Sequence, residues 1–322
     1  MPTNTAGESM SISNNRQISN ILILGAGELG MAMLNGFVKE KERRPEVKLT
    51  VLLRPSSPGK TSPESQSRQR QLEAWDVDIV TADFSRQSEQ ELATIFSHYD
   101  AVINCSGFVG GKGTQLKITR AVLLAEVARY FPWQFGVDYD RIGMGSGQPV
   151  WDEQLTVRGL LRAQQRTRWV IVSTGMFTSY LFEPSFGVVE RKSRRVNAPG
   201  NADYSVTLTT PEDIGHLTAK IFFHRPQFDN EIIYIAGDSI TYRQLAELLS
   251  EHDRCLYALV VEDHQALQDA VAASPESLTA AYRLAFARAD GVSWDKTMTY
   301  NVRQGIPVID VREWLKQQRT GF

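Results

Sequence analysis

The feature that most constrains this fold is a run of four apolar residues, 21–24, that leads directly into Gly25-Ala-Gly-Glu-Leu-Gly30. The run predicts a buried strand, and the pattern of about ten residues from Glu28 predicts a helix. A Gly-x-Gly-x-x-Gly sequence alone is weak evidence, because glycines are common in turns. Between a strand and a helix, however, Gly25 permits a tight turn, Gly27 lets a pyrophosphate approach the backbone, and Gly30 lets the helix pack closely. The sequence therefore predicts a dinucleotide site at the start of this helix.

The strand and helix pattern repeats along the first half of the chain. Further strands are predicted at residues 48–53, 77–80, 101–104, around 130–131 and at 169–173, with helices at 89–98 and about 152–165. Alternation of this kind is typical of a parallel sheet with helices on both faces. We therefore predict an α/β fold with a Rossmann-type, doubly wound parallel sheet.

Beyond about residue 176 the periodicity becomes mixed, with helices predicted at 213–223, 242–251 and 274–287. We interpret this half as a smaller C-terminal α+β lobe that binds the substrate, with some segments returning to the first domain. Residues 19–175 form the predicted nucleotide-binding domain. Residues 1–18 are rich in Ser, Asn, Thr and Gly, and we predict a disordered tail because they have little apolar surface to bury.

Composition excludes several classes of function. The 35 basic and 37 acidic side chains give a net charge of -2, without the excess of positive charge that holds nucleic acid or an anionic membrane. No apolar run reaches the roughly 18–20 residues of a membrane span, and the N-terminus does not resemble a signal peptide. The two cysteines, Cys105 and Cys255, are too few for a disulfide framework. We predict a cytoplasmic protein with no nucleic-acid and no membrane partner.

The end of the second predicted strand indicates which dinucleotide binds. NAD-selective folds carry an acid there, which bonds the ribose 2′-hydroxyl, whereas this chain has Arg54. A guanidinium can hold a 2′-phosphate through two hydrogen bonds, so the position favours NADP(H), and Lys60 or Arg68 can add positive charge. The alternative interpretation of Arg54 is a solvated arginine at a strand end.

A second segment of the predicted site follows the strand at 101–104, where ligands of open parallel sheets bind beyond the carboxyl ends of the strands. Residues 104–108, Asn-Cys-Ser-Gly-Phe, lead into a glycine-rich loop at 109–113 that we expect beside the nicotinamide half of the cofactor. Cys105 is interpreted as a small buried thiol rather than a nucleophile. The five histidines are scattered without metal-ligand spacing, so no metal site is predicted.

Residues 129–138, Arg-Tyr-Phe-Pro-Trp-Gln-Phe-Gly-Val-Asp, closely resemble the signature of the isoflavone reductase-like and phenylcoumaran benzylic ether reductase group. This group belongs to the NmrA-like atypical short-chain dehydrogenases, and the chain is particularly similar to microbial members labelled aromatic alcohol reductases. The similarity continues at 140–141, 157–158, 170–177 and 210–215. The resemblance implies a Rossmann domain that binds NADPH, a lobe that closes over it, and hydride delivery to a small aromatic or conjugated compound.

The chain departs from this group at the catalytic lysine. Alignment on Val157-Arg158 puts Gln154 at the lysine position, and residues 118–191 contain no lysine. The chain also lacks a Tyr-x-x-x-Lys sequence, which disfavours a nucleotide-sugar epimerase or dehydratase. Glutamine cannot transfer a proton near pH 7, but its amide can position a substrate carbonyl or a water. Asp138 is a second candidate for catalysis, and a turn residue that caps nearby N–H groups is an equally good interpretation of it.

These considerations give a complete predicted site and two competing functions. The predicted cofactor contacts are Gly25, Ala26, Gly27, Glu28, Leu29, Gly30, Arg54, Cys105, Ser106, Gly107, Phe108 and Phe135. The predicted substrate contacts are Gly136, Val137, Asp138, Met176, Phe177 and Tyr180. The first hypothesis is an NADPH-dependent reductase of a small aromatic substrate, with a homodimer left open. The alternative is a non-catalytic regulatory protein that senses redox state by binding NAD(P).

Overall fold

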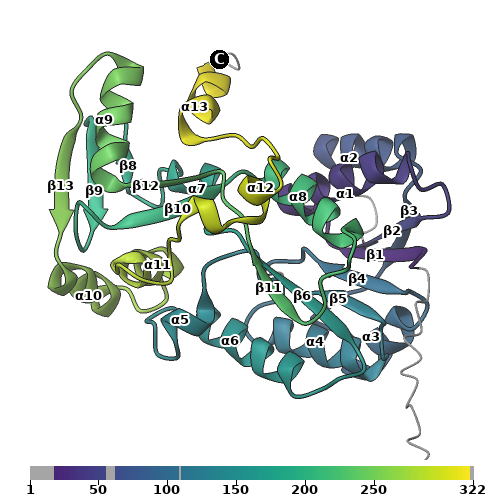
Figure 1. Cartoon of the computed structure of the whole chain (residues 1–322). Helices are drawn as coiled ribbons and strands as arrows, with labels where there is room; N and C mark the ends of the chain where they lie inside the picture. Colours follow the sequence, from purple (N-terminus) through teal and green to yellow (C-terminus); the bar gives the residue numbers. More distant parts are fainter. Residues whose placement is uncertain (1–17, 56–61, 109, 320–322) are drawn as a thin grey trace, which may run out of the picture.

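The computed structural model describes residues 18–55, 62–108 and 110–319, as drawn in Figure 1. The predicted tail therefore lies outside the described residues except for Ile18, and so do Lys60 and Val109 of the predicted cofactor loops. Ile18 packs against the hydrophobic core below the first strand.

A seven-stranded parallel sheet forms the centre of the larger part of the molecule (Figure 1). The strand order is β11-β6-β5-β4-β1-β2-β3, and the direction of winding reverses between β1 and β4. The strands are β1 (Asn20–Leu24), β2 (Lys48–Leu53), β3 (Asp78–Thr81), β4 (Ala101–Asn104), β5 (Arg129–Phe131), β6 (Arg168–Ser173) and β11 (Glu231–Tyr234). The predicted Rossmann-type fold is confirmed, and the switch point where such sheets bind ligands lies at the carboxyl ends of β1 and β4.

Helices cover both faces of this sheet, which explains why β1 is apolar at consecutive positions. Ile21 and Ile23 face one core cluster, while Leu22 and Leu24 face the cluster on the other side. In Figure 1, α1 (Glu28–Lys41), α2 (Pro63–Ala74) and α8 (Pro211–Phe223) lie on one face. The other face carries α3 (Glu89–Phe96), α4 (Thr114–Leu124) and α6 (Pro149–Arg162), with the short α5 (Tyr139–Ile142) nearby.

Helices α1 and α8 pack backbone against backbone. A Cβ on Gly36 would overlap the carbonyl oxygen of Gly215, and a Cβ on Gly215 would overlap that of Ala32. Glycine at both positions therefore allows an approach that any side chain would prevent. Since α8 and β11 come from the second half of the chain, this half completes the large sheet and its covering layer.

The smaller lobe contains two three-stranded sheets. One consists of β7 (Met176–Phe177), β10 (Ser205–Thr209) and β12 (Asp238–Thr241), the other of β8 (Val189–Glu190), β9 (Arg195–Pro199) and β13 (Ala258–Glu262). Around them lie α7 (Thr178–Leu181), α9 (Tyr242–Asp253), α10 (His264–Ala273), α11 (Leu278–Phe286) and α13 (Val311–Arg319). A 3-10 turn (Lys296–Met298) and α12 (Tyr300–Arg303) lie between α11 and α13 in the chain, and Tyr300 packs in the core cluster beside α1 and α8. The sequence pattern predicts neither α10 nor any of these short strands.

Two further observations bear on the classes of function considered above. In the described part of the chain, no helix is both long and apolar enough to cross a membrane. Cys105 and Cys255 are free thiols. Cytoplasmic location and a homodimer stay predictions.

Candidate active site

The three glycines of the first turn serve three different purposes. Gly25 has a φ of +91°, and a Cβ there would lie 3.2 Å from the carbonyl oxygen of Cys105. A Cβ on Gly30 would overlap the carbonyl oxygen of Gly25. A Cβ on Gly27, in contrast, would meet nothing within 4 Å. The fold itself therefore needs two of the glycines, while the third leaves open space beside the backbone.

That open space lies at the N-terminus of α1. Gly27 is the N-cap residue, and no side chain caps the helix. The N–H groups of a first turn have no partner within their own helix, and the helix dipole places partial positive charge there. A helix start with free N–H groups and no side-chain cap is chemically suited to an anion such as a phosphate.

A cavity of about 690 Å³ extends from this turn across the ends of β2 and β3, and we call it the glycine cavity. It contains the turn, the first two residues after β4 and two arginines. The residues that line it include Gly25, Ala26, Gly27, Leu53, Arg54, Ser65, Arg68, Thr81, Asp83, Cys105, Ser106 and Gly110. The structure thus brings Arg54 and Arg68 to the same cavity as the glycine turn.

The two guanidinium groups are held differently. Arg54 is largely exposed, and its Nε lies 3.5 Å from Oδ2 of Asp83. Arg68 donates a hydrogen bond of 3.1 Å from Nη1 to the carbonyl oxygen of Ala26. Hydrogen bonds from Ser85, together with the Arg54 charge, lower the pKa of Asp83 to about 2, so this carboxylate stays ionised. Two cations against one anion leave the cavity with an excess of positive charge.

The loop after β4 is fixed by polar side chains. Asn104 donates to Gln115 Oε1 at 2.8 Å, and Gln115 in turn donates to the carbonyl oxygen of Gly107. Glu153 of α6 accepts hydrogen bonds from the backbone of Gly113 and Gln115 and so caps α4. Cys105 is buried, and burial raises the pKa of its thiol, which therefore stays protonated and unreactive.

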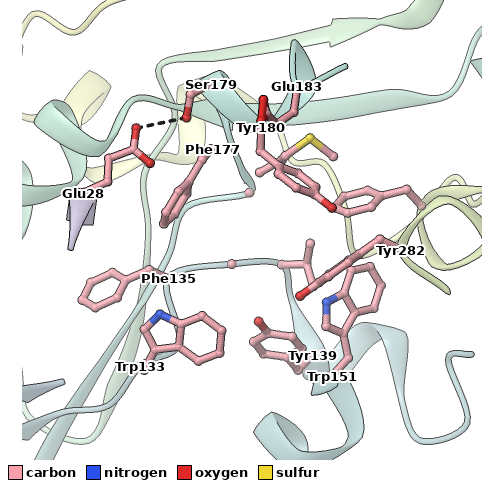
Figure 2. A pocket seen from close by; sticks show the side chains of 15 residues that line it. Glu28, Trp133, Phe135, Tyr139, Trp151, Phe177, Ser179, Tyr180, Glu183 and Tyr282 are labelled. Carbon is pink, nitrogen blue, oxygen red and sulfur yellow. Dashed lines mark hydrogen bonds between the residues drawn. The ribbon is translucent and has the colours of Figure 1, made fainter. Parts of the chain in front are cut away.

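A second cavity of about 460 Å³ lies between the large sheet and the smaller lobe, and we call it the aromatic cavity (Figure 2). Aromatic rings dominate its wall. The lining residues are Glu28, Trp133, Phe135, Gly136, Val137, Tyr139, Trp151, Gly175, Met176, Phe177, Ser179, Tyr180, Glu183, Tyr282 and Phe286. Among these described lining residues none is basic, and the titratable groups are two exposed carboxylates and three phenols.

The two cavities border neighbouring residues at the first turn of α1. Gly27 lines the glycine cavity, and Glu28, the next residue, lines the aromatic cavity. Ser179 of α7 donates a hydrogen bond of 3.3 Å to Glu28 Oε1, which Figure 2 shows at one side of the aromatic cavity. A ligand that spans both cavities would therefore pass the N-terminus of α1.

Most of the predicted substrate residues lie in the wall of the aromatic cavity. Gly136, Val137, Met176, Phe177 and Tyr180 all line it. Phe135, which was predicted to contact the cofactor, lines this cavity too. Phe108 lies beside it, with its ring 4.6 Å from the ring of Trp133, and Leu29 is buried in the core below α1.

Gln154 and Asp138 do not line the aromatic cavity. Gln154 is fully buried, and Gln134 donates hydrogen bonds to its Oε1 at 2.7 Å and its carbonyl oxygen at 3.0 Å. Asp138 is the N-cap of α5, and it accepts hydrogen bonds from Tyr234 at 2.8 Å and Arg158 at 3.3 Å. The catalytic roles assigned to both residues stay predictions, and the contacts of Asp138 fit its interpretation as a cap.

Tyr282 and Phe286 of α11 and Trp151 of α6 are wall residues that the sequence analysis misses. Trp151 packs edge-on against Phe286, with 5.1 Å between the ring centroids. The amphipathic pattern of residues 274–287 predicts a helix, but nothing local shows that its aromatic face meets residues 133–139. Only the tertiary fold brings these segments together.

With this geometry established, comparison with known proteins identifies the family. The chain matches the NmrA-like family over residues 17–282 and belongs to it. It is 42% identical over 298 residues to an NmrA-like family domain-containing oxidoreductase of Gibberella moniliformis, covering 92% of this chain and 97% of that protein. It is 26% identical over 266 residues to phenylcoumaran benzylic ether reductase 1 of Arabidopsis thaliana, covering 80% and 82%. The family resemblance found in the sequence is confirmed.

Solved structures show the same fold. The complex of leucoanthocyanidin reductase from Vitis vinifera with NADPH superposes with a TM-score of 0.73 at 19% identity, covering 93% of this chain and 99% of that one. At this identity the similarity concerns the fold.

Proposed function

We propose that this protein is an NADPH-dependent reductase of a small aromatic or conjugated compound. The observation that carries the proposal is that two cavities border the N-terminus of α1, one lined by glycine backbone and guanidinium groups and the other by aromatic rings. NADPH has a charged half and a reactive planar ring, and these two cavities match its two ends.

The residues present fit an NADP(H) molecule. The space beside Gly27 and the uncapped N-terminus of α1 would take the pyrophosphate, and Arg54 and Arg68 would take the 2′-phosphate. Arg54 is mostly exposed, and among the described residues its ion pair is the one of 3.5 Å with Asp83, so its side chain can turn toward a phosphate. The bound dinucleotide would supply the hydride. The related fold of leucoanthocyanidin reductase, solved with NADPH, supports this assignment.

The chain itself would orient the substrate and exclude water. The apolar wall of the aromatic cavity favours a flat apolar ring, and the small volume of about 460 Å³ fits a compound of one or two rings. Holding the two reactants in contact supplies much of the catalysis in hydride transfer.

Calorimetry and absorbance measurements test the proposal. We expect NADPH to bind more tightly than NADH, and NADPH absorbance to decay with at least one member of a panel of aromatic aldehydes, enones and benzylic ethers. No binding of either dinucleotide at millimolar concentration would contradict the proposal.

A non-catalytic NADP(H) sensor is the second candidate. The observation that favours it is the full burial of Gln154, which replaces the lysine and contacts Gln134 instead of the aromatic cavity. Tight NADPH binding with no turnover across the whole panel would favour the sensor.

A further inference from the structure

Two phenol hydroxyls in the wall of the aromatic cavity have no hydrogen-bonding partner among the described residues. They belong to Tyr139 of α5 and Tyr282 of α11. Tyr139 is only 5% exposed. Neither hydroxyl oxygen is one of the fully buried polar atoms that lack a partner, so both border the open space of the cavity, where water or a ligand can accept or donate a hydrogen bond. Both hydroxyls are therefore candidates to bind a ligand.

The two tyrosines converge although they are far apart in the sequence. Figure 2 shows both hydroxyls turned toward the open centre of the aromatic cavity. Burial raises the pKa of Tyr282, and the neighbouring phenols of Tyr139 and Tyr180 raise it further. Trp151 lies between the two rings, with centroids 6.3 Å from Tyr139 and 6.1 Å from Tyr282, and holds both in place.

The position of the Tyr139 hydroxyl depends on a glycine of the most specific sequence motif. A Cβ on Gly136 would overlap this oxygen, so any other residue at this position would displace it. Behind the ring, the guanidinium carbon of the fully buried Arg158 lies 5.1 Å from the centroid. Arg158 is itself fixed by Gln134 at 2.9 Å and Asp140 at 2.7 Å. The hydroxyl is thus held at the cavity surface from two sides.

We propose that Tyr139 and Tyr282 form a two-donor site that binds the carbonyl oxygen of the substrate and supplies its proton, which makes the substrate an aromatic aldehyde or ketone. This inference rests on the proposed reductase function and names its substrate class. Reduction adds a hydride to the carbonyl carbon, and the π electron pair of the carbonyl moves onto the oxygen. That oxygen takes a proton from one phenol, and the resulting phenolate regains a proton from water. A dihydronicotinamide is the reductant and is oxidised.

The chemistry of the cavity favours a carbonyl over a benzylic ether. A reaction that begins by removing a proton from the substrate needs a base. Gln154 is buried and its amide is not a base, and the carboxylates among the described lining residues, Glu28 and Glu183, are both exposed. Burial raises the pKa of Tyr139 and of Tyr282, so both phenols are donors rather than bases at neutral pH. Carbonyl reduction needs donors only, and an alkoxide is a stronger base than a phenolate, so the proton transfer is favourable.

A binding experiment tests the donors without relying on turnover. The probe is 4-(dimethylamino)cinnamaldehyde, whose absorbance moves to longer wavelength when donors polarise its carbonyl. We expect a red shift with the full wild-type chain, with or without NADP⁺, and its loss in Tyr139→Phe and Tyr282→Phe. Tyr99→Phe is the matched control, because Tyr99 packs against the core cluster of α3 and α4, outside the aromatic cavity. The control should keep the shift.

The second readout is turnover of an aromatic aldehyde with NADPH. Removing one preorganised donor to a developing oxyanion costs about 100-fold in kcat. We expect this loss in each single variant, with KM and the melting temperature little changed, and a smaller additional loss in the double variant. Tyr99→Phe should turn over like wild type.

The outcomes separate this inference from the proposed function. Reduction of benzylic ethers but of no aldehyde or ketone would overturn the two-donor site and leave the reductase proposal intact. Absence of a red shift in the wild type under both conditions, or a shift retained in both phenylalanine variants, would also overturn it. Binding of NADPH with a tyrosine-dependent red shift but no turnover would support the donor site and count against the reductase.

Discussion

The glycine cavity and the aromatic cavity are built in opposite ways. In the first, the backbone of the glycine turn forms one wall, and Gly27 leaves open space beside that backbone. In the second, side chains from α5, α6, α7 and α11 form the surface. A site made of backbone depends on a short stretch of sequence, whereas a site made of converging side chains depends on the whole tertiary fold. A family can therefore keep its cofactor site while its substrate site changes.

The two cavities also differ in their charged groups. The glycine cavity contains two guanidinium groups near an uncapped helix N-terminus. The aromatic cavity has only phenols and two carboxylates as titratable groups among its described lining residues. The first suits a phosphate and the second a neutral aromatic molecule. The predictions below test this division of roles.

The largest effect should be a contrast between two alanine substitutions in the glycine turn, one at a glycine that the fold needs and one at a glycine that the ligand needs. We expect Gly30→Ala to lower the free energy of unfolding by about 1–3 kcal/mol, because its Cβ overlaps the backbone of Gly25. Gly27→Ala has room and should leave stability nearly unchanged while NADPH binding weakens. Urea unfolding and calorimetry on both variants measure the contrast. Equal losses of stability would refute it.

Next in size is the selectivity for the 2′-phosphate. Hydrogen bonds to charged groups contribute about 1.5–3 kcal/mol, so Arg54→Glu should weaken NADPH binding about 10- to 100-fold and change NADH binding little. Arg86→Glu is the matched control, because Arg86 also lies near Asp83, at 3.9 Å, but does not line the glycine cavity. Calorimetric titration of both dinucleotides checks this result, and equal losses for the two would remove the role of Arg54.

A smaller effect should follow from filling the space beside Tyr139. Gly136→Ala places a methyl group where the hydroxyl lies, so we expect kcat for an aromatic aldehyde to fall about tenfold while NADPH affinity stays the same. Gly159→Ala on α6 is the control, since its Cβ would meet nothing within 4 Å. Steady-state kinetics distinguish the two. An unchanged kcat in Gly136→Ala would separate this glycine from the substrate site.

The smallest effect concerns pH and the charges behind the aromatic cavity. Hydrogen bonds from Arg162 and Arg158 lower the pKa of Asp140 to about 2 from its usual 3.8. A lowered folded-state pKa stabilises the protein above the unfolded-state pKa, and this stabilisation is lost as the pH falls from about 4 to about 2. Asp140→Asn should make stability depend less on pH across that window. Urea unfolding at several pH values gives the slopes.

Sequence reasoning succeeds where a segment is buried on both faces of the sheet. Residues 21–24 and 101–103 are continuous apolar runs because helices cover both sides, and the structure places β1 and β4 there within one residue. The strands of the smaller lobe are harder to predict from sequence, because β7 and β8 contain only two residues each. Strands this short have no periodicity of their own and form only because a neighbouring strand pairs with them.

Single residues of the substrate site are also difficult to predict from the sequence alone. Alignment places Gln154 on α6, but whether the residue reaches the cavity depends on the rotation of that helix, which the fold sets. Tyr282 contributes to the wall from a helix more than a hundred positions beyond Tyr139. No local sequence pattern indicates a contact between residues so far apart in the chain, so the role of Tyr282 could not be predicted from the sequence.

The glycine-to-glycine contact between α1 and α8 has a consequence for how this protein can be divided. A chain cut after residue 175 would lose α8 and β11, and the buried face of α1 that carries Met33 and Phe37 would be exposed to water. We therefore expect that a fragment ending at residue 175 does not fold on its own. Exchanging lobes between relatives, in evolution or in the laboratory, therefore has to transfer or rebuild this helix and edge strand along with the substrate pocket.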